Sequence, residues 1–448
     1  MSNNIDLKKG LDIPVKGAAA QKVVKTVIPD VVAIKPTDFK GLIPRLLVKE
    51  GDKVLAGSPV LADKQNPDIL FTSPVSGTVK EIVRGDKRKL LAVLVETDPV
   101  QQKVDFGAKD ADSLTKEEVK NLLLKSGLWG ALIQRPYGVM ADPSAGPKAI
   151  FVSAFSTAPL APDTDFTLSG KAQDIQAGII ALTKITDGGV HLCINKATEA
   201  KSPFAKMDKA IIHSVSGKHP AGNVGVQISH ISPIRKGEIV WTVSPLLLAA
   251  IGHLVLTGRL DLMRKVAITG PAADEPAYVE TFPGAPVKSL TASYEGVRYI
   301  GGDILTGEVI GKDGYLGFFQ DQICLISEGT EREILGWAKP FRMNLHSSSK
   351  CYFSWLAPKK LYSMDTNLHG GPRAFVQTKC FEDVTPMEIF PIYLIKACLA
   401  GDIDKMEKYG IYEVLPEDLA LCDYVDPSKN DIQDIISKGI DLMIKEMA

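Results

Sequence analysis

The spacing of hydrophobic and polar positions changes several times along this chain. Over about residues 40–97, short runs rich in β-branched residues are separated by Gly and Pro, which predicts a compact all-β unit of hairpins. From about 101 to 257, strand-like apolar runs alternate with helical patterns, which predicts an α/β domain with a parallel sheet. The chain is therefore expected to fold as several domains.

Capping residues place individual elements of the α/β region. Thr115 and Glu118 form a capping box before a helix that Gly127 is expected to end. Strands are then expected over 149–155, 190–195 and 210–215, and a helix over 173–185. Ligands on such a sheet bind at the carboxyl ends of its strands.

The stretch 239–258 contains no Asp, Glu, Lys or Arg and has the length of a membrane span. Its two halves differ in pattern, because 239–243 is typical of a short buried strand. Ser244 is a natural N-cap and Pro245 a natural first residue for an apolar helix that Gly258 can end. We interpret the stretch as a strand followed by a buried helix, so no transmembrane helix is expected.

The pattern changes again after about residue 258. Strand candidates at 265–269, 277–281, 297–300 and 323–326, with at most one small helix, predict a small α+β domain of the β-grasp kind.

After about residue 330 the chain becomes helical. Thr385-Pro386-x-Glu388 predicts a capped helix over 389–399 that ends at Gly401, with a kink at Pro391. A last helix over 431–447 carries its apolar residues on one face. The expected domains are 1–100 (all-β), 101–257 (Rossmann-like α/β), 258–330 (β-grasp-like, soluble-ligand-binding type) and 331–448 (helical).

Composition narrows the classes of function. The 448 residues include 52 Lys and Arg against 53 Asp and Glu, for a formal net charge of −1, so a generic nucleic-acid partner is not expected. With hydrophobic residues at 45%, the chain is too apolar to be disordered. Its six cysteines form no C-x-x-C pair, which favours a reduced, cytosolic compartment.

Nucleotide-binding motifs are incomplete. The spacing Gly217-x4-Gly222 is that of a phosphate loop, but Asn223-Val224 stands where Lys and Ser or Thr would bind phosphate and magnesium. No glycine follows the strand that ends at Phe155, so the dinucleotide fingerprint is also missing. The turn around Gly222 is interpreted either as a pocket wall or as an ordinary loop.

Metal and cluster motifs are incomplete too. His213, His219 and His230 have spacings that match no common ligand pattern. Cys422 precedes Asp426 where a ferredoxin-type segment would have a second cysteine, and one thiolate cannot hold an iron–sulfur cluster. We therefore predict no metal ligands and no catalytic residues in this chain.

The N-terminal hairpins resemble the biotinyl/lipoyl, or barrel-sandwich hybrid, domains. The resemblance lies in 48–61 and 72–79, and in that family a lysine on a hairpin tip carries lipoate. Lys64 lies near the corresponding place, but 65–67 reads Gln-Asn-Pro and the distance to Pro74 is longer than the family's pattern. Lys64 is interpreted either as a modified lysine or as an ordinary exposed hairpin residue.

Several motifs occur in the same order as in one known family. They are Lys8-Lys9-Gly10-Leu11-Asp12-Ile13-Pro14, Gly127-Leu128-Trp129, Arg135-Pro136, His219-Pro220-Ala221-Gly222, Leu256-Thr257-Gly258, Asp303-Ile304-Leu305-Thr306-Gly307 and Pro416-Glu417-Asp418-Leu419-Ala420-Leu421-Cys422. Through them the whole chain resembles the A subunits of sodium-translocating NADH:quinone oxidoreductases. It is distantly similar to the soluble Rnf and complex I subunits that carry flavin and iron–sulfur centres.

The resemblance implies a peripheral subunit on the cytoplasmic side of a bacterial inner membrane, in a complex that couples quinone reduction to sodium export. It implies integral-membrane subunits as partners and quinone as a possible bound substrate, with NADH, flavins and the iron–sulfur centre on other subunits. The relatives' glycine-rich loop is replaced here by 127–137, whose bulky residues would block a flavin phosphate. No tightly bound cofactor is therefore expected.

A quinone site would need an apolar, aromatic-lined pocket with one or two hydrogen-bond donors. Trp129, Arg135, Tyr137 and His219 are the candidates, on two loops expected near one end of the sheet. Core packing for the aromatic residues and a surface role for the arginine are the alternative. Two other functions stay open: an interaction scaffold that docks through its last helix, and a flavin or iron–sulfur electron carrier.

Overall fold

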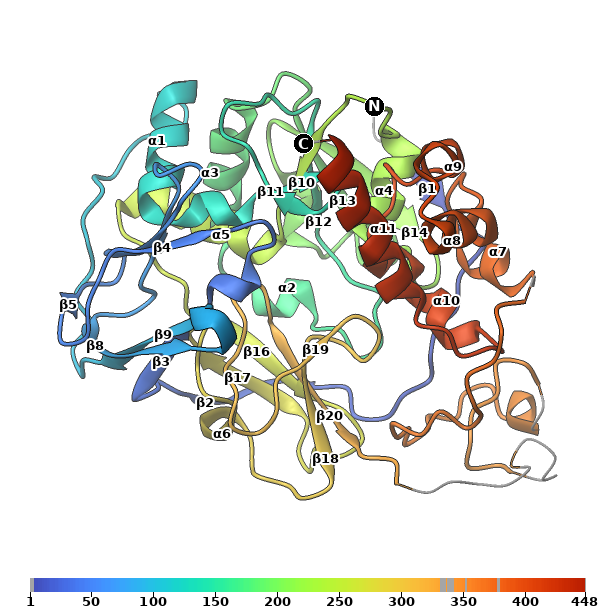
Figure 1. Cartoon of the computed structure of the whole chain (residues 1–448). Helices are drawn as coiled ribbons and strands as arrows, with labels where there is room; N and C mark the ends of the chain where they lie inside the picture. The colour runs from blue at the N-terminus through green and yellow to red at the C-terminus, as the bar shows by residue number, and fades with distance from the viewer. Residues whose placement is uncertain (1–3, 331–335, 337–341, 351–352, 377–378, 448) are drawn as a thin grey trace.

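The computed structural model describes residues 4–330, 336, 342–350, 353–376 and 379–447. Within these residues the strands form sheets of seven, six, four and three strands, and a group of helices follows at the C-terminal end (Figure 1). Regions of the described chain thus differ in architecture, from mainly strands to mainly helices.

The two smaller sheets form the barrel-sandwich unit. Their strand orders are β3-β9-β8-β5 and β4-β6-β7. The bounds are β3 (Val31–Ile34), η1 (Pro36–Asp38), β4 (Pro44–Leu46), β5 (Lys53–Val54), β6 (Pro59–Asp63), β7 (Leu70–Thr72), β8 (Gly77–Arg84), η2 (Asp86–Arg88) and β9 (Leu90–Thr97). Apolar residues of these strands are buried in continuous runs, and Val60 in β6 and Val93 in β9 are fully buried.

The first residues of the chain belong to other sheets. β1 (Asn4–Asp6) pairs in parallel with β14, and β2 (Ala20–Thr26) pairs in parallel with β17. Both strands are short or largely exposed, so they carry no clear hydrophobic pattern. The N-terminal segment therefore adds one strand to the seven-stranded sheet and one to the six-stranded sheet before it enters the barrel-sandwich unit. The expected all-β region 1–100 did not include these pairings.

The seven-stranded sheet has the order β1-β14-β13-β12-β15-β10-β11. Its remaining strands are β10 (Ile133–Arg135), β11 (Val139–Met140), β12 (Ile150–Ser153), β13 (Val190–Asn195), β14 (Ala210–Ser216) and β15 (Val240–Thr242). Strands β12 to β15 are parallel, as predicted, whereas β10 pairs antiparallel with both β15 and the edge strand β11. The helices of this region are α1 (Lys116–Ser126), η3 (Leu128–Ala131), α2 (Thr164–Thr167), α3 (Ala172–Thr183), η4 (Pro203–Lys206), α4 (Val224–Ile231) and α5 (Pro245–Thr257).

Helix α5 has the caps that the sequence predicts. The Ser244 hydroxyl accepts a hydrogen bond from the Leu247 N–H, and Gly258 ends the helix with a φ of 67°. α5 lies against α3 so closely that a Cβ at Gly252 would be 1.6 Å from the Asp174 carbonyl oxygen. Along the described chain, every helix is too short or too polar to cross a membrane.

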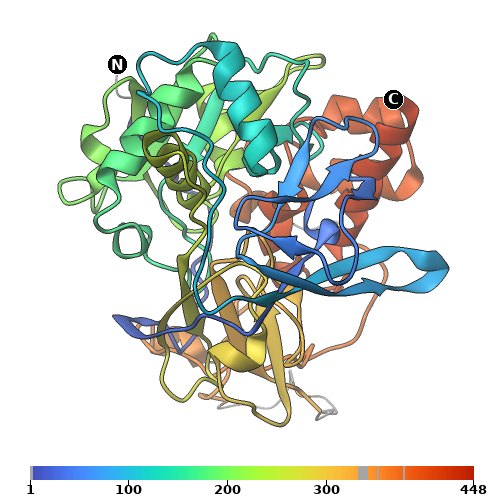
Figure 2. The ribbon, with the colours of Figure 1, turned by 90° about the vertical axis from the view of Figure 1, so that its left-hand side faces the viewer.

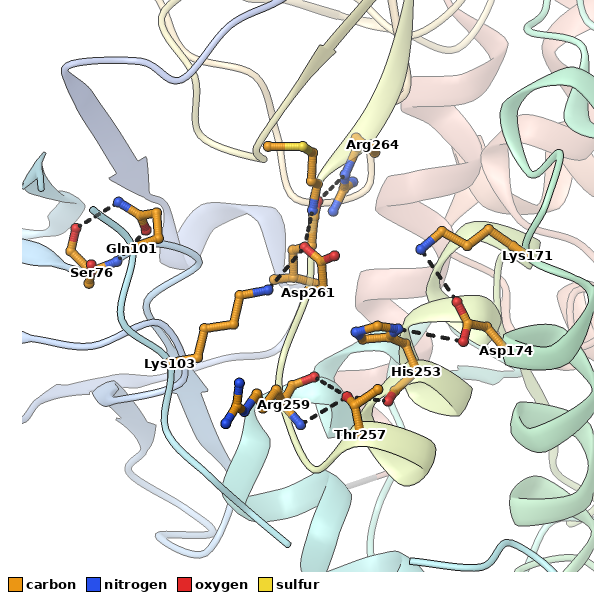
Figure 3. A network of polar contacts seen from close by, with 12 residues as sticks. Ser76, Gln101, Lys103, Lys171, Asp174, His253, Thr257, Arg259, Asp261 and Arg264 are labelled. Atoms are coloured by element: carbon orange, nitrogen blue, oxygen red, sulfur yellow. Dashed lines mark hydrogen bonds and ion pairs between the residues drawn. The ribbon is translucent and has the colours of Figure 1, made fainter. Parts of the chain in front are cut away.

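The six-stranded sheet has the order β19-β18-β20-β16-β17-β2. Its elements are β16 (Arg264–Thr269), β17 (Ala277–Thr281), α6 (Val287–Leu290), β18 (Val297–Gly301), β19 (Glu308–Val309) and β20 (Gln322–Ser327). Figure 3 shows the polar contacts at its junction with the first two regions, where Lys103 Nζ lies 3.6 Å from Asp261 Oδ1. Beyond that junction, the buried Arg264 donates through Nη1 to the Phe318 carbonyl oxygen at 2.6 Å.

The C-terminal region is helical. Its elements are η6 (Phe353–Leu356), α7 (Cys380–Val384), α8 (Pro391–Ala400), α9 (Ile403–Tyr409), η7 (Pro416–Leu419), α10 (Ala420–Val425) and α11 (Ile432–Met447). The prediction for 385–399 was wrong in two respects, and the first is that Thr385 ends α7 and does not begin a helix. α8 begins at Pro391 instead of being kinked there, because its proline occupies the first helical position, where no backbone N–H is needed. Gly401 ends the helix, as expected.

The apolar face of α11 is packed within its own region. Ile432, Ile436, Ile440 and Met443 are each fully buried in the core that α8 and η7 also form. These four residues therefore pack within the chain itself, and docking through the last helix stays a prediction.

A buried ion pair joins the C-terminal helices to the seven-stranded sheet. Arg135, at the end of β10, reaches Asp418 Oδ2 through Nη1 at 2.7 Å and Glu417 Oε1 through Nη2 at 2.6 Å. The Arg135 side chain is 2% exposed and that of Asp418 is 0% exposed. A Cβ at Gly225, in the first turn of α4, would lie 2.1 Å from Arg135 Nη1, so glycine there makes room for the guanidinium.

Substituting Arg135 should therefore destabilise the chain more than an exposed arginine would. Arg135→Met leaves Asp418 buried without its partner, and we expect the free energy of unfolding to fall by about 3–5 kcal/mol in urea titrations. Arg298→Met is the matched control, because it breaks the half-exposed pair with Glu328 and should cost about 0–1 kcal/mol. Equal losses in the two variants would contradict a structural role for the buried pair.

Candidate functional site

Trp129 is part of the core. Its side chain is fully buried, and its Nε1 donates to the Ala141 carbonyl oxygen at 2.8 Å. Its ring packs edge-on against Trp241, with ring centroids 5.5 Å apart. The indole therefore has its donor satisfied and no free face for a ligand.

His219 is also buried, in different surroundings. It follows the carboxyl end of β14, and its Nδ1 lies 3.2 Å from the Thr157 hydroxyl, while its backbone N–H donates to Asp12 Oδ1. Burial lowers the pKa of the imidazole, so the neutral form is favoured. The carboxylates of Asp12, Asp303 and Asp418 oppose that shift but do not outweigh it.

Arg135 and Tyr137 belong to the edge of the sheet. Arg135 lies opposite Val240, the first residue of β15, so its backbone is at the amino end of that strand and not beside His219. Tyr137 is half-buried and has a φ of 83°. Its ring packs edge-on against that of Tyr412, with the ring centroids 6.2 Å apart. The four candidates thus occupy separate surroundings, although Asp418 is near both Arg135 and His219.

An aromatic crevice lies on the other side of the segment that carries Trp129. We call the aromatic crevice the space lined by Phe39, Phe71 and Phe318, together with Gly127 and Leu128. The Phe39 ring is 4.5 Å from that of Phe71 and 5.0 Å from that of Phe318. Three regions of the chain therefore contribute walls: the barrel-sandwich unit, the α1–η3 junction and the loop before β20.

Glycines allow these walls to come together. A Cβ at Gly130, within η3, would lie 2.9 Å from the Phe39 ring and 3.0 Å from the Phe71 ring. Gly127 combines a φ of 82° with close contact to Thr72, so it both ends α1 and brings η3 against β7. Gly127 and Leu128 of the motif Gly127-Leu128-Trp129 thus line the crevice, whereas Trp129 is a core residue packed on Trp241.

Polar groups in the aromatic crevice are few and partly buried. Lys35 Nζ lies 3.0 Å from Asp38 Oδ1, and Asp38 Oδ2 accepts from the Phe318 N–H at 2.8 Å. Burial raises the pKa of the Asp38 carboxyl above its usual value. The free volume of the crevice is about 30 Å³, which is room for about one water molecule. A six-membered ring can therefore enter only if Phe39 or Phe318 moves.

Four of the five described cysteines are buried. Burial raises the pKa of the thiols of Cys193, Cys398 and Cys422 to about 12, which disfavours the thiolate that metals bind. His213, one of the three histidines whose spacing matches no ligand pattern, faces His191. Nε2 of His213 lies 2.9 Å from Nδ1 of His191. No metal-binding group of three or more His, Cys, Asp or Glu occurs among the described residues, and Cys351 lies outside them.

Lys64 lies exposed on the turn between β6 and β7. The neighbouring Asp63 is buried and accepts hydrogen bonds from the N–H groups of Gln65 and Asn66 at 3.3 Å, which fixes the turn. An accessible lysine on a defined turn is compatible with both interpretations of Lys64.

Comparison with known proteins identifies the regions by family. The model of the NqrA N-terminal barrel-sandwich hybrid domain matches residues 5–98, and that of the NqrA second alpha/beta domain matches 114–260. A third model, described as the NQRA C-terminal domain, matches 265–311. Among solved structures, an air-oxidized NAD⁺-reducing nickel–iron hydrogenase is 12% identical, with a TM-score of 0.34 over 75% of this chain and 68% of that one, which assigns no fold.

Curated relatives are similar over nearly the whole chain. Among the A subunits of Na(+)-translocating NADH-quinone reductases, that of Yersinia pestis (strain Angola) is 37% identical over 95% of this chain and 96% of its own length. Those of Neisseria meningitidis and Pasteurella multocida are 35% and 36% identical, over 99% of this chain and 100% of theirs. Identity at this level over full-length chains shows common descent, and the chain belongs to the family of Na(+)-translocating NADH-quinone reductase A subunits.

Proposed function

We propose that the chain works as a peripheral subunit on the cytoplasmic side of the membrane, supporting quinone reduction coupled to Na⁺ export. Its partners would be the other subunits of the complex, integral-membrane subunits among them. The relatives' names support an oxidoreductase complex that translocates Na⁺. The described helices, none of which could cross a membrane, are compatible with attachment through such partners.

The aromatic crevice is the observation that carries a quinone-binding role. Quinone rings bind where aromatic side chains flank a flat space and a few polar groups meet the carbonyl oxygens. Phe39, Phe71 and Phe318 would supply the ring contacts, and Lys35 Nζ would donate to a quinone carbonyl in place of Asp38. The closed crevice requires a ring movement on binding, so the headgroup would bind by induced fit.

The four candidate residues from the sequence would support quinone binding indirectly. Trp129 would hold η3 against Phe39, and Arg135 would fix β10, which follows η3, to the C-terminal helices. Tyr137 is the candidate with the most exposure and lies just after Arg135, on the strand-to-strand turn at the sheet edge. His219, neutral and bonded to Thr157, would stabilise the contact between the N-terminal segment and the sheet.

The chain itself would hold no redox centre. Flavin, the iron–sulfur centre and the NADH site would belong to other subunits. The raised thiol pKa values of Cys193, Cys398 and Cys422 and the bulky segment 127–137, with Trp129 filling the core, support this division. Electrons would then reach a quinone held here, or beside this chain, from a neighbouring subunit.

Photolabelling tests quinone binding at the aromatic crevice. A photoreactive quinone analogue should label 33–39, 71–74 or 126–128 in the assembled complex, and excess unlabelled quinone should compete with it. Phe39→Leu keeps an apolar side chain but removes the ring contact, so labelling should weaken by about 3- to 10-fold.

Phe390→Leu is the control for this experiment, because Phe390 is 59% exposed on the C-terminal region and far along the chain from the crevice. Photolabelling of the Phe390→Leu variant should match that of the unmodified chain. Label confined to other segments, or label that excess quinone does not displace, would contradict a quinone site at the crevice. Thermal unfolding of each variant shows whether it is folded.

The absorption spectrum of the purified chain tests the absence of a redox centre. We expect no visible absorbance beyond the aromatic bands, before or after addition of free flavin and its removal by gel filtration. A flavin or iron–sulfur band that co-purifies in constant ratio with the chain would instead make it an electron carrier like the Rnf relatives.

A further inference from the structure

The β8–β9 hairpin projects from the barrel-sandwich unit. Figure 2 shows it extending beyond the rest of the molecule, on the side where the C-terminal helix ends. The strands stay paired to the tip, where Arg84 lies opposite Leu90. We call residues 84–91 the hairpin tip.

The hairpin tip and the strand before it concentrate positive charge. Residues 80–89 contain five basic and two acidic side chains, a net charge of +3 on a chain whose total is −1. The basic residues are all exposed: Lys80, Arg84, Lys87, Arg88 and Lys89. None of their charged groups forms an ion pair within the described part of the chain.

Backbone geometry holds these side chains outward. The Gly85 N–H donates to the Lys89 carbonyl at 2.9 Å, and Arg84 Nη1 donates to the Arg88 carbonyl at 3.2 Å, which closes the tip. Lys87 and Arg88 have φ values of 53° and 60°, an uncommon conformation for residues other than glycine. The tip is therefore a defined turn that presents adjacent cations.

An exposed apolar side chain accompanies the cations. Leu91 is 37% exposed and lies over Gly85, where a Cβ would be 2.9 Å from Leu91 Cδ1. Clustered Lys and Arg beside an exposed leucine is the composition of segments that bind anionic membrane surfaces. A projecting tip reaches a flat layer of phosphates without any matching concavity, which an acidic protein partner would have to provide.

We propose that the hairpin tip binds the phosphate groups of anionic phospholipids and so orients this face of the chain toward the membrane. The proposal goes beyond quinone binding and does not depend on it. It rests on the exposed, unpaired cations, on their projection from the body, and on membership of a family whose complex moves Na⁺ across a membrane.

Vesicle co-sedimentation of the full chain tests the proposal. The chain should bind phosphatidylcholine vesicles that contain about 30% phosphatidylglycerol, and not pure phosphatidylcholine, at low salt. Each basic residue near an anionic surface contributes about fivefold in affinity, so Lys87→Gln, Arg88→Gln and Lys89→Gln together should weaken binding on the order of 100-fold. Raising the salt concentration should weaken it as well.

The control carries the same loss of charge elsewhere. Lys116→Gln, Lys120→Gln and Lys125→Gln neutralise three lysines of α1 and should leave vesicle binding within about twofold, because α1 is away from the hairpin tip. Equal loss in both triple variants, or no binding of the unmodified chain to anionic vesicles, would overturn the proposal. If the hairpin variant bound vesicles normally but failed to assemble, the tip would bind an acidic protein instead. Quinone labelling should persist in the hairpin variant, so the two proposals fail separately.

Discussion

The buried Arg135 guanidinium constrains the arrangement of the whole molecule. A charge with a 2% exposed side chain must be paired, and both partner carboxylates come from η7, more than 280 residues later in the chain. The pair fixes the antiparallel strand β10, next to the edge strand β11, to the C-terminal helices. Because η3 leads directly into β10, the pair also fixes the segment that forms one wall of the aromatic crevice.

Close approach between backbones is the second constraint. Gly225 makes room for Arg135, Gly130 for Phe39 and Phe71, and Gly252 for α3. Each contact joins elements that are distant in sequence, and each would be lost with any larger residue at the glycine. Aromatic rings meet at the crevice because Gly130 lets the barrel-sandwich unit and η3 touch.

Much of the secondary structure could be predicted because its signals are local. Ser244, Pro245 and Gly258 specify both ends of α5, and Thr115 with Glu118 specifies the start of α1. Prediction failed where a local signal was ambiguous, since the capping pattern at Thr385 competes with a proline at 391 that starts α8. It also failed for strands whose partners are far away, as for β1 and β2.

The candidate site could be predicted only in part. Segment 127–137 left two interpretations open for its aromatic residues, a quinone pocket or core packing, and Trp129 packs on Trp241 in the core. Phe39, Phe71 and Phe318 come from segments with no common motif, so no pattern in the sequence brings them together. Contacts between such distant residues depend on tertiary packing, which sequence periodicity does not encode.

The central claim is that a quinone headgroup meets this chain at the aromatic crevice, which has to open to admit it. The most direct measurement is a structure of the assembled complex with quinone bound. The account predicts a headgroup in contact with Phe39 and Leu128, with the Phe39 or Phe318 ring displaced from its present position. A headgroup held entirely by another subunit, with the crevice closed, would contradict it.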